Sequence, residues 1–132
     1  MNDLTMQQAI RLFAAINFTV IGLSHLLRPH EWVEFFVWLR GKGRTGVFLN
    51  GMLSLSFGSL IVAFHNVWTG LPIVLTIVGW AQVVKALISL TAPQVGMRSL
   101  ERVSVERARE FPAAGAAFLV LAALMWYLVV AR

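Results

Sequence analysis

Residues 71–90 read LPIVLTIVGWAQVVKALISL, a continuous apolar run in which Lys85 carries the one charge. A helix rises about 1.5 Å per residue, so roughly 20 apolar residues cross the ~30 Å hydrocarbon core of a bilayer. Three other stretches have a similar length and character. We therefore predict four membrane spans, over about residues 10–27, 46–64, 71–90 and 113–131.

The composition of the whole chain agrees with this prediction. Of its 132 residues, 58% are hydrophobic and 13% charged, and the mean hydropathy is +0.76. A soluble domain of this size carries more charge and could not bury this much apolar surface. Disorder requires the opposite composition. We expect one integral membrane domain over residues 1–132, an all-α polytopic protein built as a four-transmembrane-helix bundle.

Proline and charge mark the ends of the spans. Pro29, Pro93 and Pro112 stand at predicted boundaries, because proline lacks the amide proton of a helix interior but fits a first turn. The first span differs from a cleaved secretory signal, since Asp3 lies where such a signal carries positive charge. We therefore expect this span to remain in the mature protein.

Basic residues predict the orientation of the chain. They cluster in the connections 28–45 and 91–111, while the connection between the second and third spans has none. The positive-inside rule places both basic connections in the cytoplasm and both termini outside. This clustering beside apolar runs fits anionic lipid headgroups and not a nucleic acid, despite a net charge of +5. The residues expected to contact headgroups are Arg28, Arg40, Lys42 and Arg44.

The connections also show helical patterns. Residues 29–40 read PHEWVEFFVWLR, with Trp32, Phe35, Phe36 and Leu39 on one helical face. This pattern predicts an amphipathic helix, either lying in the cytoplasmic interface or packed under the bundle. Residues 94–110 are more polar and predict a solvated cytoplasmic helix.

A faint internal repeat accompanies these patterns. TVIG at residues 19–22 returns as TIVG at 76–79, and the same alignment places Arg28 opposite Lys85. Two units related by a pseudo-twofold axis would produce this similarity, and so would chance likeness between apolar segments.

Polar side chains within the spans form the candidate site. An amide or ionisable group in the bilayer must face protein, water or a headgroup. One interpretation is a shared polar cluster that binds a headgroup, a small polar ligand or an ion. The other is hydrogen bonding between helices together with a snorkelling lysine. No span contains a carboxylate to pair with the lysine, so a lipid phosphate is a natural partner. The set comprises Asn17, His25, Asn50, Gln82 and Lys85.

Other chemistry has little support in the sequence. The chain has no cysteine, GKGRTG at residues 41–46 lacks the spacing of a phosphate loop, and His30 with Glu34 lacks a third metal ligand. No nucleophile is paired with a base. We therefore predict no catalytic residue, no metal and no cofactor.

The turn between the second and third spans is also a candidate site. His65 and Asn66 are expected to cap the end of the second span, and Trp68 to lie at the outer membrane interface. Small residues at Ser54 and Gly58, and at Ala113 and Ala117, allow close helix approach within the bundle or in a dimer.

Residues 65–93 read HNVWTGLPIVLTIVGWAQVVKALISLTAP. This stretch resembles a family of small multi-span bacterial inner-membrane proteins with an HNVW turn, a T-x-x-G-W helix, a lysine and a closing proline. GLSHLLRPHEWVEFF at residues 22–36 resembles DoxX-type four-helix membrane proteins. These resemblances imply a multi-pass protein of the bacterial cytoplasmic membrane but no reaction or cofactor. The matching positions are His65, Asn66, Val67, Trp68, Thr76, Gly79, Trp80, Lys85 and Pro93.

Our first functional prediction is a non-enzymatic protein that binds membrane lipids or serves as an accessory subunit, as a homo-oligomer or with another membrane protein. The alternative is a small oligomeric transporter or channel with a polar path through Asn17, Gln82 and Lys85. An enzyme acting on a membrane-dissolved substrate is the third possibility.

Overall fold

The computed structural model describes residues 5–102 and 107–131, which form helices and no strand. The predicted all-α class is thus confirmed. Four of the helices, α1, α3, α4 and α6, are long and apolar enough to cross a membrane. The helices are α1 (Met6–Leu27), α2 (Pro29–Gly41), α3 (Arg44–Phe64), α4 (Ile73–Thr91), α5 (Pro93–Glu101) and α6 (Glu110–Ala131).

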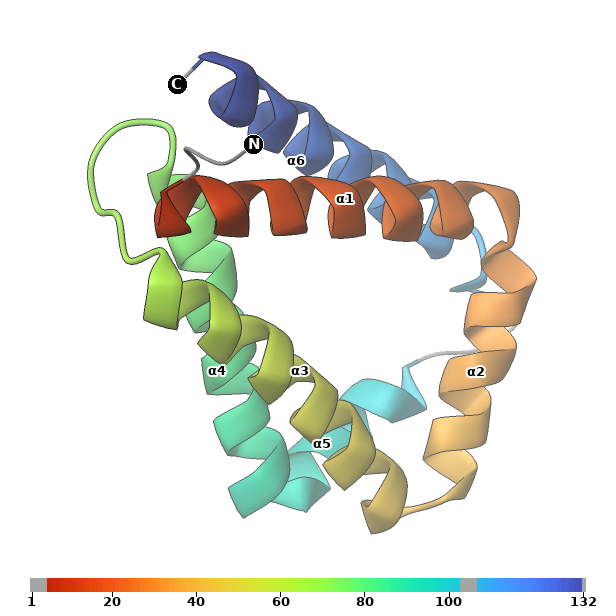
Figure 1. Ribbon diagram of the computed structural model, residues 1–132. Coiled ribbons are helices and arrows are strands. Elements are labelled where there is room, and N and C mark those ends of the chain that lie inside the picture. The colour runs from red at the N-terminus through yellow and green to blue at the C-terminus, as the bar shows by residue number, and fades with distance from the viewer. Residues whose placement is uncertain (1–4, 103–106, 132) are drawn as a thin grey trace.

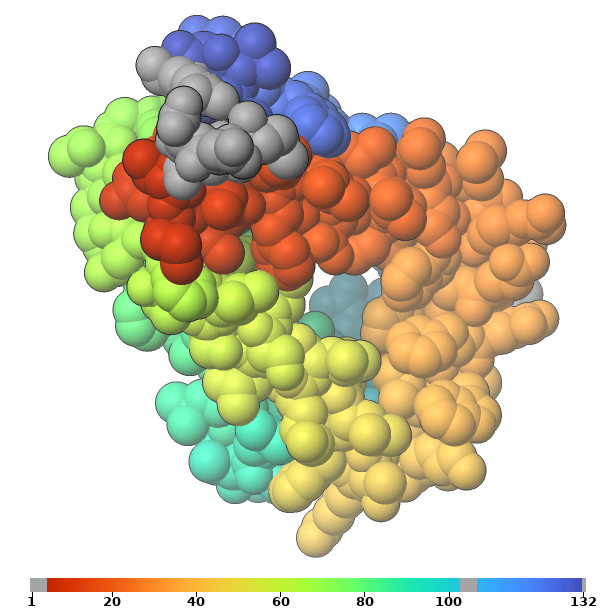
Figure 2. Space-filling model, viewed as in Figure 1, coloured from red at the N-terminus to blue at the C-terminus, as the bar shows by residue number. Residues whose placement is uncertain are grey.

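The four long helices form two antiparallel pairs, α1 with α6 and α3 with α4 (Figure 1). The pairs meet at one end, where α1 and α4 begin and α3 and α6 end. We call this end the vertex. Away from it the pairs diverge, and α2 and α5 bridge the opposite, open side. In the space-filling view, α1, α2 and α3 leave a hollow between them (Figure 2).

Two prolines set the corners on the open side. Pro29 is the first residue of α2 and Pro93 the first of α5. A proline disfavours helical dihedrals in the residue before it. Arg28 and Ala92 accordingly share nearly the same non-helical backbone, with φ −134° at both and ψ of 55° and 70°. The same local rule thus turns the chain twice, once in each half.

Each helix pair is closed by a contact between two glycines. A Cβ atom on Gly58 would lie 2.7 Å from the carbonyl oxygen of Gly79, and one on Gly115 would lie 2.7 Å from that of Gly22. Such contacts need residues without side chains. Gly79 lies 57 residues after Gly22, and Gly115 lies 57 residues after Gly58. The faint repeat in the sequence therefore corresponds to two structural units, α1–α3 and α4–α6. The glycine contacts pair the first helix of each unit with the third helix of the other.

The small-residue faces differ in what they contact. Ser54 and Gly58 are buried, and Gly58 and Gly115 serve the α3·α4 and α1·α6 pairs inside the chain. Ala113 and Ala117 are exposed on α6.

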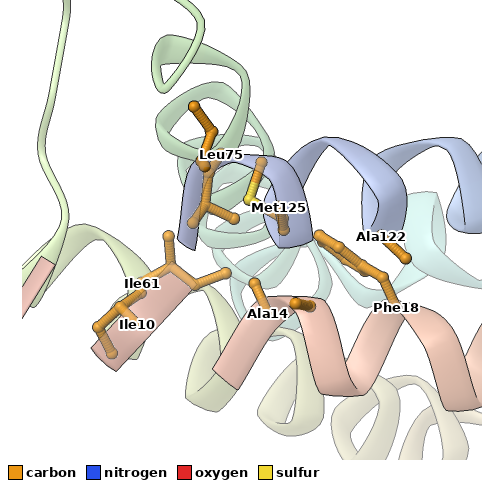
Figure 3. Close-up of a cluster of buried hydrophobic side chains, with 9 residues drawn as sticks. Ile10, Ala14, Phe18, Ile61, Leu75, Ala122 and Met125 are labelled. Carbon is orange, nitrogen blue, oxygen red and sulfur yellow. The ribbon is translucent and has the colours of Figure 1, made fainter. Parts of the chain in front are cut away.

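The main core lies at the vertex (Figure 3). Phe18 of α1, Ile61 of α3 and Leu75 of α4 are almost fully buried there, together with Met125 of α6. Each of the four long helices thus contributes to it. A smaller cluster of Leu39, Val47 and Leu100 joins α2, α3 and α5 on the open side.

The outer surface is apolar along the long helices. Val130, Leu27 and Val120 are 80%, 72% and 70% exposed. A water-soluble protein rarely presents so much contiguous apolar surface, whereas a bilayer requires it.

Helix α2 packs against the rest of the chain, which is one of the two arrangements expected for it. Val33 and Leu39 are buried against the rest of the chain, while Glu31 and Glu34 are exposed. Trp38 is 52% exposed, which suits an anchor at headgroup depth.

Candidate ligand site at Lys85

The five polar residues predicted to form a cluster within the spans do not all come together in the structure. They are Asn17, His25, Asn50, Gln82 and Lys85. Asn17 Nδ2 donates a hydrogen bond of 2.9 Å to the carbonyl of Phe13, in its own helix. His25 Nδ1 lies 2.8 Å from the carbonyl oxygen of Ile21, also in α1, and its ring stacks on Trp32 with centroids 4.1 Å apart. These bonds satisfy the polar groups within one helix and leave them uninvolved with α4.

Asn50 and Lys85 do come together. They face the same open cavity of about 340 Å³, which lies between α3, α4 and α5. Polar and apolar side chains share its lining. The lining residues are Val47 and Asn50 from α3, Ala81, Val84, Lys85, Ile88 and Ser89 from α4, and Val95, Gly96 and Ser99 from α5.

The polar groups of this cavity have no protein partner among the described residues. No side-chain hydrogen bond or ion pair to another described residue is made by Lys85, Asn50, Ser89 or Ser99. Ser89 is only 4% exposed. Among the described residues, every side-chain oxygen or nitrogen that is fully buried has a hydrogen-bond partner. Because the Ser89 hydroxyl has no such partner, it is not fully buried and is accessible from the cavity. Polar groups beside apolar walls cost free energy unless something bonds to them. The cavity is therefore suited to a polar guest.

The repeat explains why this cavity occurs in one half of the chain. Pro29 follows the crossing glycine Gly22 by seven residues, whereas Pro93 follows Gly79 by fourteen. The extra seven residues add about two turns, or about 10 Å, to α4 before the chain bends. Lys85, which the repeat aligns with Arg28, comes directly before these extra residues, and Ile88 and Ser89 of the lining lie within them.

The first half closes the corresponding crevice with an aromatic side chain. Trp32, three residues after its proline, stacks on His25, and its indole Nε1 donates to Ser24 Oγ at 2.8 Å. In the second half the residue three after the proline is Gly96, and a Cβ there would lie 3.3 Å from Ser89 Oγ. In the first half, Trp32 and Ser24 therefore bond to each other beside a smaller cavity of about 230 Å³. In the second half, the cavity at Lys85 has an open polar lining.

Gln82 lies against the glycine crossing and not in the cavity lining. Its Cβ is 2.8 Å from the position of a Cβ on Gly58. With Asn17 bonded to its own helix, the described contacts do not connect Asn17, Gln82 and Lys85.

A second cavity, of about 280 Å³, adjoins the first, since Ser99 of α5 lines both. The remaining lining residues of the second cavity are His25, Arg102, Arg107, Glu110, Phe111 and Ala114.

The turn between α3 and α4 is held by side chains that cross-link it. The His65 backbone N–H caps α3 by donating to Ile61 at 2.7 Å, but its side chain does not cap the helix as the sequence suggested. Instead, His65 Nε2 accepts from Arg11 Nε at 3.0 Å, and Nδ1 lies 3.3 Å from Thr76 Oγ1. Because Nε2 is an acceptor, the imidazole is neutral with its proton on Nδ1. Burial, and secondly the charge of Arg11, hold the pKa of His65 below its usual value.

Asn66 also has a role other than capping. Its Oδ1 accepts hydrogen bonds of 3.1 Å from the indole groups of both Trp68 and Trp80. Trp68 is 54% exposed, as expected at an interface. Sequence reasoning missed Arg11 and Thr76 as partners of this turn, although an arginine within a span is a signal that it needs an acceptor.

The basic residues expected at headgroups lie on the open side. Arg28 is 3.6 Å from the Glu31 carboxylate in an exposed pair, which contributes little to stability. Lys42 Nζ lies 5.3 Å from the centre of the Trp38 ring. Arg44 borders a surface groove beside Pro93, and Arg40 is half-buried.

Comparison with known protein families, curated proteins and solved structures gives no match to this chain. Within residues 5–102 and 107–131, no group of three histidine or acidic residues is placed to hold a metal ion.

Proposed function

We propose that this chain is a non-enzymatic, multi-pass protein of the bacterial cytoplasmic membrane that binds an anionic lipid at Lys85. The observation that carries the proposal is the open cavity in which Lys85, Asn50, Ser89 and Ser99 lack partners among the described residues. An ammonium group beside apolar walls is stabilised by an anion that brings its own apolar portion. A lipid phosphate with its glycerol and acyl groups has this character.

The surroundings of the cavity support a lipid ligand. Val47, Ala81, Val84 and Ile88 supply an apolar wall, against which hydrocarbon can pack. The polar groups come from three different helices, so they converge on one point in space. Convergent polar groups in a largely apolar pocket are typical of ligand sites.

The position of the basic connections supports the orientation we propose. Helices α2 and α5 both lie on the open side of the molecule (Figure 1). With that side in the cytoplasm, Lys42 and Arg44 would meet the anionic leaflet and raise the local concentration of acidic lipid. The resemblance of residues 65–93 to small bacterial inner-membrane proteins is consistent with this location.

The test is to purify the protein in mild detergent and identify bound lipids by native mass spectrometry. Lys85→Gln should lose the retained anionic lipid. Arg109→Gln removes the same charge from an exposed residue outside the cavity lining and should keep it. Circular dichroism and gel filtration establish that both variants fold. A folded Lys85→Gln protein with an unchanged lipid profile would overturn the proposal.

A further inference from the structure

We infer that the ligand is one phosphodiester lipid per chain, with a single negative charge and an uncharged headgroup that carries hydroxyls, as phosphatidylglycerol does. The inference rests on the proposed function and narrows the ligand of that same site. Three features of the cavity support it: the balance of charge, the kind of hydrogen-bonding groups, and the difference between the two halves of the chain.

The balance of charge favours a monoanion. Among the described residues, Lys85 is the one cation in the lining, and they contribute neither a carboxylate nor an aromatic ring to it. The ammonium group of an ethanolamine or choline headgroup would therefore find no counter-charge and no ring face. A phosphate monoester carries close to two negative charges at neutral pH, which a single lysine does not neutralise. A phosphodiester with an uncharged headgroup matches the lysine one to one.

The remaining polar groups favour a headgroup with hydroxyls. Asn50 offers two donors and an acceptor through its amide, and the hydroxyls of Ser89 and Ser99 both donate and accept. A hydroxyl on the ligand can likewise donate and accept, so it can satisfy any of the three. A bare phosphate only accepts, and it would leave the amide oxygen of Asn50 without a donor.

The asymmetry between the halves predicts a stoichiometry of one. The repeat places a related crevice in the first half, but Trp32 occupies it and bonds to Ser24. The space that remains beside Trp32, a cavity of about 230 Å³, is lined by the Glu31 carboxylate and by no cation of the described residues. It is therefore unsuited to a second lipid of the same kind.

The test uses nanodiscs of phosphatidylcholine that contain equal amounts of phosphatidylglycerol, phosphatidylethanolamine and phosphatidic acid, with acyl chains of distinguishable mass. After gentle release, native mass spectrometry should show one phosphatidylglycerol per chain, favoured roughly tenfold over phosphatidylethanolamine. Lys85→Gln should abolish this preference. Asn50→Ala and Ser99→Ala should reduce the preference over phosphatidic acid and retain the preference over phosphatidylethanolamine.

The possible outcomes separate this inference from the proposed function. Equal binding of phosphatidylglycerol and phosphatidic acid, both lost in Lys85→Gln, would overturn the headgroup inference and leave the anionic-lipid site in place. Binding that does not respond to Lys85→Gln would overturn both. Two Lys85-dependent lipids per chain would refute the stoichiometry. A final arm adds glycerol 3-phosphate to delipidated protein in detergent. Thermal stabilisation equal to that by the lipid would refute a lipid source.

Discussion

The two glycine crossings make a strong prediction about stability. A Cβ on Gly58 would lie 2.7 Å from the oxygen of Gly79 and 2.9 Å from the nitrogen of Val83. Both are backbone atoms, which cannot rotate away as a side chain can. Any side chain at Gly58 must therefore push α3 and α4 apart, and the same reasoning applies to Gly115 between α6 and α1.

The magnitude follows from the balance of two effects. Forcing extra carbon atoms into a packed contact costs about 1–3 kcal/mol. Valine forms helix only a few tenths of a kcal/mol better than glycine, so the gain in helix propensity is several times too small to offset this cost. We expect Gly58→Val and Gly115→Val each to lower the free energy of unfolding by about 2 kcal/mol. Because they act in different helix pairs, the double variant should be additive within about 0.5 kcal/mol.

The assay is reversible unfolding in mixed micelles, followed by circular dichroism and tryptophan fluorescence. Gly41→Val is the matched control, because no atom lies within 4 Å of a Cβ at that position. It should change stability by less than about 0.5 kcal/mol. If Gly58→Val were as mild as this control, or if one crossing tolerated valine and the other did not, the duplicated close packing would be refuted.

Three further predictions concern other parts of the molecule. Protonation of His65 would remove the acceptor for Arg11, and its pKa lies below the usual 6.5. The contribution of neutral His65 to the free energy of unfolding is then fully present above about pH 6.5. It declines as the pH falls, by up to about 1.4 kcal/mol per pH unit. In unfolding measured from pH 7.5 to 5, His65→Gln should flatten this decline. Trp32→Phe keeps the ring stack but loses the indole hydrogen bond, so unfolding should show a loss of about 1 kcal/mol, and an unchanged stability would argue against that bond. Because the chain has no cysteine, Lys42→Cys should react with a membrane-impermeant maleimide only in inside-out vesicles and Thr69→Cys only in intact spheroplasts; the reverse pattern would overturn the proposed orientation.

The helices themselves could be predicted from the sequence with good accuracy. Apolar length and proline position depend on local chemistry alone, and α2 and α5 begin at Pro29 and Pro93 as expected. Helix α5 ends at Glu101, however, earlier than the predicted end at residue 110, and residues 103–106 of that prediction lie outside the described residues. Pro112 did not mark a boundary so closely, because α6 begins at Glu110. A proline in the first turn removes a donor that has no helical partner there, so the helix can begin before it.

The pairing of the helices could not be predicted in the same way. In lipid, apolar side chains on every face of a helix are equally well solvated, so hydropathy does not select a partner. The information lay in two pairs of glycines, Gly22 with Gly79 and Gly58 with Gly115, each separated by 57 residues. With so few matching residues between apolar segments, that separation was indistinguishable from chance until the backbone contacts were known.

The site was predicted in part. Lys85 and Asn50 were among the predicted candidates, and the structure places them at one cavity. Ser89 and Ser99 were missed, because a helical serine commonly bonds to its own backbone and gives no sign of a ligand. For the same reason Asn17 and His25, which reach carbonyls four residues earlier, do not join the cavity.

The pairing of α1 with α6 bears on how the protein is made. Helices α3 and α4 are neighbours in the chain and can associate as soon as both have been synthesised. Helix α1 precedes α2, α3, α4 and α5 in the chain, while its partner α6 follows all of them. Its polar side chains Asn17, Thr19 and His25 each bond to a carbonyl of α1 itself. These three groups are thus satisfied in an apolar environment before α6 has been made.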